Sequence, residues 1–234
     1  MSIALPAPDA PVASIGAAIA RMEAIGSALP PADGLGCFNR MYLDVTVQVN
    51  NRIGQGLFAD PAFLTDLDVT FANLYFAAAD TAGTPAAVPL AWRPLVERRA
   101  TAGIEPVQFA LAGMNAHINH DLPLAVVSTC TALATAPDAG SHYADYQKVD
   151  QLLDAADQSV RQSFENAAEL AADRHMAVVA NLIATWTINS ARDLAWNNCL
   201  LLWATRDDPI ARGLFLDTLA TSTALASQML LVAV

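Results

Sequence analysis

The sequence predicts an all-α fold, a single domain built as a bundle of about seven to eight helices. Apolar residues recur at steps of three and four along several long segments, which is the spacing of one face of an α-helix. Glycine and proline mostly fall between these segments, and the alternation typical of strands is rare. Hydrophobic residues make up 54% of the 234 residues and charged residues 15%, so the chain has enough apolar surface for one large core.

We expect one domain over residues 1–234, with residues 1–8 as a flexible tail. The predicted helices span residues 9–28, 38–55, 61–80, 90–102, 106–134, 142–173, 175–205 and 209–231. The buried stripe of the second helix comprises Phe38, Met41, Tyr42, Val45, Val49 and Ile53. The stripe of the fifth comprises Val107, Leu111, Met114, Ile118, Leu122 and Ala125. The stripe of the sixth comprises Tyr146, Val149, Leu153, Ala156 and Val160.

Capping residues and polarity define several helix ends. Asp60 before Pro61 is a typical start for the third helix, and Ser141 is a good cap for the sixth. Asp66 and Asp68, near the start of the third helix, are expected to complement its dipole. The closing segment, 213–234, is apolar but contains too many polar residues for a membrane span, so we expect a buried closing helix.

Charge and cysteine content exclude several classes of protein. The net charge is -11, with 12 Lys and Arg against 23 Asp and Glu, so nucleic acid is not an expected partner. Cys37, Cys130 and Cys199 are widely spaced and form neither a disulfide framework nor a metal knuckle. We expect three buried free thiols, a cytoplasmic location and no secretory signal. The composition does not determine the oligomeric state, and a homo-oligomer is compatible with it.

A cluster of imidazole, amide and carboxyl groups lies in the fifth predicted helix. His117 and His120 are three residues apart and His117 and Asp121 are four apart, so these side chains can share one helix face. Asn115 and Asn119 lie close by and could orient a ring or contact a substrate. We predict catalytic roles for His117, Asp121 and Asn115, and substrate binding for Asn119. An internal hydrogen-bond clamp between helices is the structural alternative.

Pro123 follows this cluster directly. It has no N–H to donate to the carbonyl of Asn119, so we expect the helix to kink or break there. The carbonyl freed by the proline could act as a ligand or orienting group.

The sixth predicted helix offers a second group of polar residues. His142 and Asp145 continue the apolar stripe that includes Tyr146, and a carboxylate on a core face is costly unless it is paired or bound to a metal. We predict a metal-ligand set of His117, His120, Asp121, His142 and Asp145, with zinc as the first choice. Capping and interhelical contacts are the alternative for His142 and Asp145.

Three further segments supply candidate residues. Asp44, at the edge of the second helix's buried stripe, is a candidate catalytic acid, and Tyr42 beside it is a candidate substrate contact. Arg192 and Trp196 are one helical turn apart, and Arg192 could bind a carboxylate of a substrate or of the protein itself. Together with Tyr146 they are predicted to contact the substrate.

The run GMNAHINHDLPLAVV resembles the signature of an uncharacterised bacterial domain family, common in actinobacteria, with a G-x-N-A-H-I-N-x-D-L core. The runs FNRMYLDVT, LDVTFANLYFAA, PLAWRPL and HYADYQKVDQLL are similar to its other blocks in the same order, over roughly residues 35–205. The resemblance implies an all-helical fold and a shared constellation of Asn115, His117, Asn119 and Asp121. His120 takes the variable position of the motif.

Three hypotheses of function remain open. The first is a hydrolase in which His and Asp residues hold a divalent metal that activates water. The second is a metal-free cyclase or isomerase that uses His117 in acid–base chemistry on a polyketide, terpenoid or lipid. The third is a helical protein that binds a ligand or a partner without catalysis. In all three, the apolar composition favours a small apolar molecule between helices.

Overall fold

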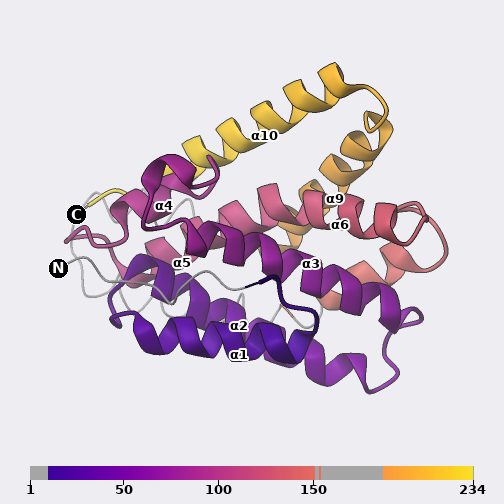
Figure 1. Ribbon diagram of the computed structural model, residues 1–234, viewed down its shortest axis with the longest axis horizontal. Coiled ribbons are helices and arrows are strands. Elements are labelled where there is room, and N and C mark those ends of the chain that lie inside the picture. The colour runs from indigo at the N-terminus through magenta and orange to yellow at the C-terminus, as the bar shows by residue number, and fades with distance from the viewer. Residues whose placement is uncertain (1–9, 151–152, 154–186, 234) are drawn as a thin grey trace.

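Figure 1 shows the computed structural model of the chain, which describes residues 10–150, 153 and 187–233. Every regular element in these ranges is helical, so the predicted all-α, multi-helix fold is confirmed. The α-helices are α1 (Ile15–Ala28), α2 (Gly34–Ile53), α3 (Pro61–Asp80), α4 (Arg93–Arg98), α5 (Pro106–Ala116), α6 (Leu122–Ala132), α9 (Ile188–Ala204) and α10 (Pro209–Leu230). Two short elements, the 3-10 turn η1 (Pro85–Ala87) and the π-helical turn η2 (His117–Asp121), join them. Residues 142–150 are also helical.

Capping side chains account for where the helices begin. The Asp60 carboxylate accepts from the N–H of Phe63, and α3 begins at Pro61 as predicted. The first helix begins at Ile15 rather than at residue 9, because the extended residue Ser14 is its cap. Asp33 caps α2, which therefore begins four residues earlier than predicted. The predicted helix over 90–102 is shorter, and large parts of those over 142–173 and 175–205 lie outside the described residues.

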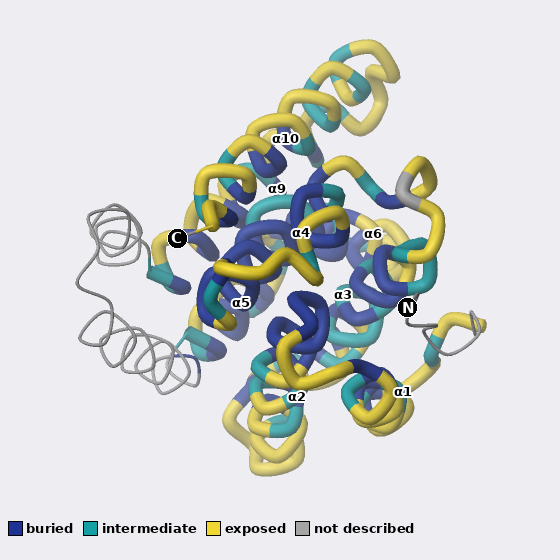
Figure 2. The backbone as a smooth tube through the Cα atoms, turned by 90° about the vertical axis from the view of Figure 1, so that its left-hand side faces the viewer, coloured by how far each residue is buried: buried dark blue, intermediate teal, exposed yellow. Residues whose placement is uncertain are grey.

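The segment from α5 to α6 runs through the centre of the fold. Figure 1 shows α1 and α2 along one edge and α10 along the other, with α3, α5 and α6 between them. Helix α5 contacts α2 and α10, η2 contacts α3, α9 and α10, and α6 contacts α3 and α9. In Figure 2 exposed residues run along the length of α10, whose buried residues begin only at Leu219, whereas α5 is largely buried. The closing helix is therefore not buried as a whole, contrary to the expectation from the sequence. The turn η2 is therefore enclosed by helices that are far apart in sequence.

Helices α2 and α5 cross at short distance next to η2. A Cβ atom at Gly113 of α5 would lie 2.4 Å from the ring of Phe38 on α2, so the two helices can approach this closely only because residue 113 has no side chain. Phe38 thereby reaches the neighbourhood of His117, one turn further along the chain.

An irregularity is present next to Pro123, where the sequence predicts a kink or break, but the helix widens ahead of the proline rather than breaking at it. The turn ahead of the proline widens into a π-helix, in which the N–H of Leu122 donates to the carbonyl of His117, five residues earlier. Helix α6 then continues with Pro123 in its first turn, where a missing N–H costs little. Single π-helical turns are frequent at functional sites, and this one contains the predicted His/Asp cluster.

None of the helices within the described ranges combines the length and the low polarity that a bilayer crossing requires. Cys37, Cys130 and Cys199 are buried free thiols, as expected.

Candidate functional site

Asp121 ends the π-helical turn and gathers three nitrogen atoms around one buried carboxylate. Its Oδ2 atom lies 3.1 Å from Nδ1 of His117 and accepts a hydrogen bond from Nε1 of Trp92 at 2.8 Å. Its Oδ1 atom lies 2.7 Å from Nδ1 of His120. Burial by itself would raise the pKa of Asp121, but the hydrogen bonds from His117 and His120 outweigh it and lower the pKa. Asp121 is therefore ionised near neutral pH.

This carboxylate determines where the protons lie on both imidazoles. An ionised carboxylate only accepts hydrogen bonds, so Nδ1 of His117 and Nδ1 of His120 must both be donors. In the neutral ring the other nitrogen, Nε2, then carries a free lone pair. Burial lowers the pKa of His117, and the hydrogen bond and charge of Asp121 oppose this only in part. His117 is thus a neutral base near pH 7 whose basic atom is Nε2.

Aromatic side chains enclose the ring of His117. Phe71 stacks on it with ring centroids 3.5 Å apart and planes 4° apart. Tyr42 meets it edge-on at a centroid distance of 4.5 Å, and Phe38 and Trp92 lie at 5.6 and 5.8 Å. His117 is 2% exposed, and its Nε2 atom is buried with no hydrogen-bond partner among the described residues. The imidazole is therefore rigidly oriented while its basic atom remains uncommitted.

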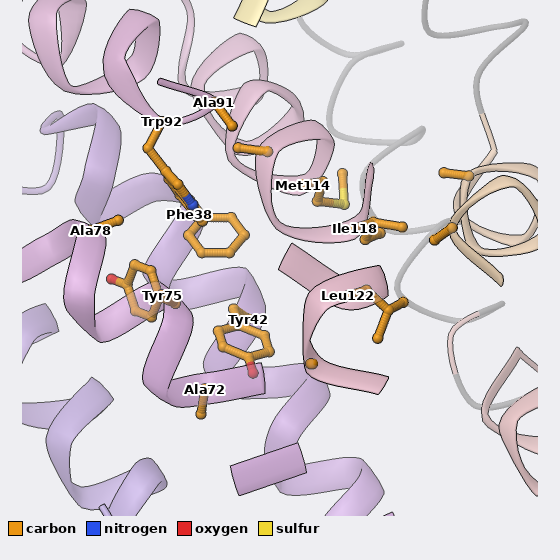
Figure 3. Close-up of a cluster of buried hydrophobic side chains, with 14 of the residues drawn as sticks. Phe38, Tyr42, Ala72, Tyr75, Ala78, Ala91, Trp92, Met114, Ile118 and Leu122 are labelled. Carbon is orange, nitrogen blue, oxygen red and sulfur yellow. The ribbon is translucent and has the colours of Figure 1, made fainter. Parts of the chain in front are cut away.

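His117 lines a cavity of about 90 Å³ whose wall is mostly apolar. Figure 3 shows part of the wall, with the rings of Phe38 and Tyr42 on one side and Met114, Ile118 and Leu122 on the other. A water molecule needs about 10–15 Å³ of cavity volume on this measure, so the space suits a small organic molecule of several non-hydrogen atoms. The partly exposed residues of the wall lie on α2 and α3; they are Met41, Val45, Asp68 and Phe71. The cavity therefore lies nearest to solvent on the side formed by these two helices.

Tyr42 and Asp68 add two further uncommitted polar atoms to this wall. The Oη atom of Tyr42 and the Oδ2 atom of Asp68 are buried without a hydrogen-bond partner in the described part of the chain. Burial raises the pKa of Asp68 to about 7. Burial, followed by the charge of Asp68, raises the pKa of Tyr42 well above its usual value. A buried polar group without a partner costs about 1–3 kcal/mol, so three of them around one cavity indicate a binding site for a polar group.

Asp68 is the residue that the sequence interpretation missed. The sequence assigned it to the helix dipole, whereas the residue lines the cavity and its Oδ2 atom is buried. It follows Leu64 by four residues and precedes Phe71 and Tyr75 by three and seven, which is the spacing of the buried face of α3. That position on an apolar stripe is the signal that could have identified it.

Asp44, predicted as a catalytic acid, does not reach this site. It is exposed on α2 and takes no part in the cavity wall. Residues two apart on a helix do not face the same side, and Tyr42 is the one that points inward. The acid next to Tyr42 comes from α3 and is Asp68.

Asn115 connects two helices, Asn119 hydrogen-bonds to Asn115, and neither takes part in the cavity wall. The Nδ2 atom of Asn115 donates to the carbonyl of Thr223 and to Oγ of Ser227, both at 2.9 Å, and so ties α5 to α10. Its Oδ1 atom accepts from Nδ2 of Asn119 at 2.9 Å. This geometry is that of a clamp between helices.

His142 and Asp145 form a second polar group, separate from His117. His142 stacks on Phe63 at 3.9 Å and lies 3.0 Å, through Nδ1, from the carbonyl of Ala136. The carboxylate of Asp145 accepts from the backbone N–H groups of Ala59 and Asp60 and from the side chains of Ser141 and Lys148. Burial would raise the pKa of Asp145, but these hydrogen bonds lower it to about 2. The group anchors the 142–150 helix to the start of α3.

The five predicted metal ligands therefore do not converge. His142 contacts Phe63 and His117 contacts Phe71, and these two phenylalanines are eight residues apart on α3, about 12 Å at 1.5 Å per residue. One ion cannot span that distance, since metal–ligand bonds are about 2 Å long. Within the described ranges no three His, Cys, Asp or Glu side chains are arranged to hold a metal ion.

Arg192, Tyr146 and Trp196 form a contact between α9 and the 142–150 helix. Arg192 pairs with the carboxylate of Asp150, and its guanidinium lies 4.0 Å from the centroid of the Tyr146 ring. Tyr146 donates its hydroxyl to the carbonyl of Arg192 at 2.7 Å, and Trp196 packs on the Tyr146 ring at 4.7 Å. Arg192 and Tyr146 line the cavity, but their polar groups are already engaged.

The fold and this geometry describe an all-helical protein in which His117, paired with Asp121, lines a mostly apolar cavity. Sequence comparison adds that the chain belongs to DUF5995, a family of unknown function, whose profile matches residues 15–233. No curated protein and no solved structure matches the chain. The family match agrees with the resemblance to an uncharacterised domain and names no reaction, so function has to be argued from the site itself.

Proposed function

We propose that the protein is an enzyme that transfers protons on a small, largely apolar substrate, with His117 as the general base and Asp121 as the residue that orients it. The observation that carries this proposal is the state of the His117 ring. One nitrogen is committed to a buried carboxylate at 3.1 Å, and the other is a buried free base in a ring that lines an apolar cavity. Proton transfer by a positioned imidazole contributes typically about 10²–10⁴-fold to a rate.

The surroundings suit this role electrostatically. When His117 takes a proton, the ring becomes a cation in a buried place, which is costly unless a negative charge lies nearby. Asp121 supplies that charge, and Trp92 and His120 hold the carboxylate in position through its two oxygens. The mostly apolar wall favours a bound apolar molecule over water next to the base, and the cavity is open enough for the proton on His117 to exchange with solvent.

The metal-dependent hydrolase is supported less well, because the proposed ligands divide into two separate groups and both Nδ1 atoms next to Asp121 are engaged. A chelator nevertheless belongs in the test, since zinc remains a prediction.

The experiment measures hydrogen–deuterium exchange at the carbon next to a carbonyl group. The purified protein is incubated in D₂O with butanone, cyclopentanone or cyclohexanone, and deuterium uptake is followed by NMR. His117→Gln should lower the exchange rate by about 10²–10⁴-fold, because the amide lacks a basic nitrogen. His142→Gln is the matched control, since His142 lies outside the cavity wall, and should keep the rate.

Three outcomes contradict the proposal. If the protein exchanges none of the probes faster than buffer does, it has no catalytic role of this kind. If a probe binds tightly without exchange, the result supports a ligand-binding protein instead. Equal rates in wild type and His117→Gln remove His117 as the base. Loss of exchange with a chelator and recovery with zinc would support the metal-dependent alternative.

A further inference from the structure

Tyr42 and Asp68 line the same cavity as His117, and each carries a buried oxygen atom. Tyr42 is 6% exposed, and neither its Oη atom nor Oδ2 of Asp68 has a hydrogen-bond partner among the described residues. The two groups come from facing helices, α2 and α3, and are close enough for the charge of Asp68 to act on Tyr42. The Tyr42 ring also lies 4.5 Å from the His117 ring.

We infer that Tyr42 and Asp68 together bind the oxygen of a carbonyl group, and that the substrate is an uncharged ketone, aldehyde or ester with a C–H bond next to that carbonyl. This inference rests on the proposed function, because it assigns His117 the removal of the neighbouring proton. Two neutral donors aimed at one oxygen stabilise the negative charge that develops there when the proton leaves.

The charges around the cavity favour an uncharged substrate. The cationic side chain in the described wall is Arg192, and its charge is paired with Asp150 while its Nη2 atom donates to the carbonyl of Tyr146. A carboxylate or phosphate group would therefore meet no unpaired cationic side chain in the described part of the wall. It would also lie near Asp68, whose ionised form would repel it.

The chemical step balances within the site. The lone pair on Nε2 of His117 takes the proton from the carbon, the C–H electrons form a carbon–carbon double bond, and the carbonyl π electrons move to the oxygen. The resulting enolate oxygen accepts hydrogen bonds from the Asp68 carboxylic acid and the Tyr42 hydroxyl. The proton on His117 then moves to another carbon, which gives isomerisation, or it is first replaced by a deuteron from D₂O that returns to the same carbon, which gives exchange. Burial raises the pKa of Asp68 to about 7, so the carboxyl group keeps its proton in slightly acidic solution.

The test reads the hydrogen bonds to the carbonyl without requiring turnover. Cyclopentanone labelled with carbon-13 at the carbonyl is bound to the His117→Gln protein, and its C=O stretching frequency is measured by infrared difference spectroscopy at about pH 6, below the pKa of Asp68. The stretch should lie at a lower frequency than in an apolar solvent, because both donors weaken the double bond. Tyr42→Phe and Asp68→Leu, each in the His117→Gln background, should shift the band back toward the apolar value.

Matched variants and a rate measurement complete the test. Tyr143→Phe and Asp66→Asn change exposed residues of the same types and should leave the band unmoved. With His117 intact, Tyr42→Phe and Asp68→Leu should each slow exchange by about 10²–10³-fold, the usual cost of one donor to an oxyanion. The inference would be overturned if the C=O stretch in His117→Gln had the same frequency as in an apolar solvent. It would also be overturned if neither Tyr42→Phe nor Asp68→Leu changed that frequency. If exchange still depended on His117 in that case, the proposed function would stand without it.

Discussion

The substitution Asp68→Asn tests the buried carboxyl group through stability alone, without any substrate. Burial raises the pKa of Asp68 from 3.8 to about 7 in the folded protein. Between these values the folded state holds a proton that the unfolded state has released. The stability linked to this proton is fully present below about pH 4 and is lost as the pH rises through about 7.

The size of the effect follows from the two pKa values. A difference of about three pH units at 1.36 kcal/mol each gives at most about 4 kcal/mol. Asp68 keeps partial exposure, which makes the free-energy contribution smaller than this maximum. Only part of the pH range between the two pKa values falls within the interval from about pH 5 to about pH 8. We expect wild type to lose about 2 kcal/mol more than Asp68→Asn over that interval, because the amide does not ionise.

The assay is urea unfolding followed by circular dichroism at several pH values. Other titrating groups are common to both proteins and largely cancel in the difference between them. Asp66→Asn is the control on the same helix, because Asp66 is exposed and should follow wild type at every pH. Parallel curves for wild type and Asp68→Asn from about pH 5 to about pH 8 would refute the buried, unpaired carboxyl group.

Three further substitutions test other parts of the structure. Asp121→Asn should lower exchange by about 10³–10⁴-fold, because an amide no longer enforces a proton on Nδ1 of the base, and a loss below tenfold would contradict that role. Gly113→Ala should destabilise the protein by about 1–3 kcal/mol in urea unfolding, because the new Cβ would meet Phe38 at 2.4 Å, while Gly213→Ala, with open space around it, should not. Asp145→Asn should lower the free energy of unfolding by about 2–4 kcal/mol near pH 7 and leave the exchange rate unchanged. Loss of exchange in a variant that stays folded would instead indicate that Asp145 belongs to the functional site. The Asp145 contribution should fade in wild type as the pH falls from 3.8 toward about 2.

Helical periodicity was sufficient to predict the fold class and many of the helix positions. The apolar stripe of α2 and the proline start of α3 both match the structure, because local side-chain spacing and capping determine them. The π-helical turn could not be predicted from spacing, since its extra residue is stabilised by packing against α3, α9 and α10. Pro123 indicated an irregularity but not its form.

The sequence identified the His117–Asp121 pair because both residues lie on one helix, where spacing determines proximity. It could not tell which distant acid would join them, and it placed Asp44 where the structure has Asp68. Nor did local spacing reveal the partner Trp92, whose indole donates to Asp121 from a segment 29 residues away. Such partners depend on how helices cross, which local patterns do not contain.

The nitrogen atoms of His117 offer the most direct test of the central claim. In protein labelled with nitrogen-15 at histidine, long-range proton–nitrogen NMR spectra distinguish the two neutral tautomers and the cation, and His→Gln variants assign the four rings. Near pH 7 we predict a neutral His117 with its proton on Nδ1, and an Nε2 resonance that moves when cyclopentanone binds while that of His142 does not. A proton on Nε2, or an Nε2 resonance that saturating ketone leaves unchanged, would contradict the account.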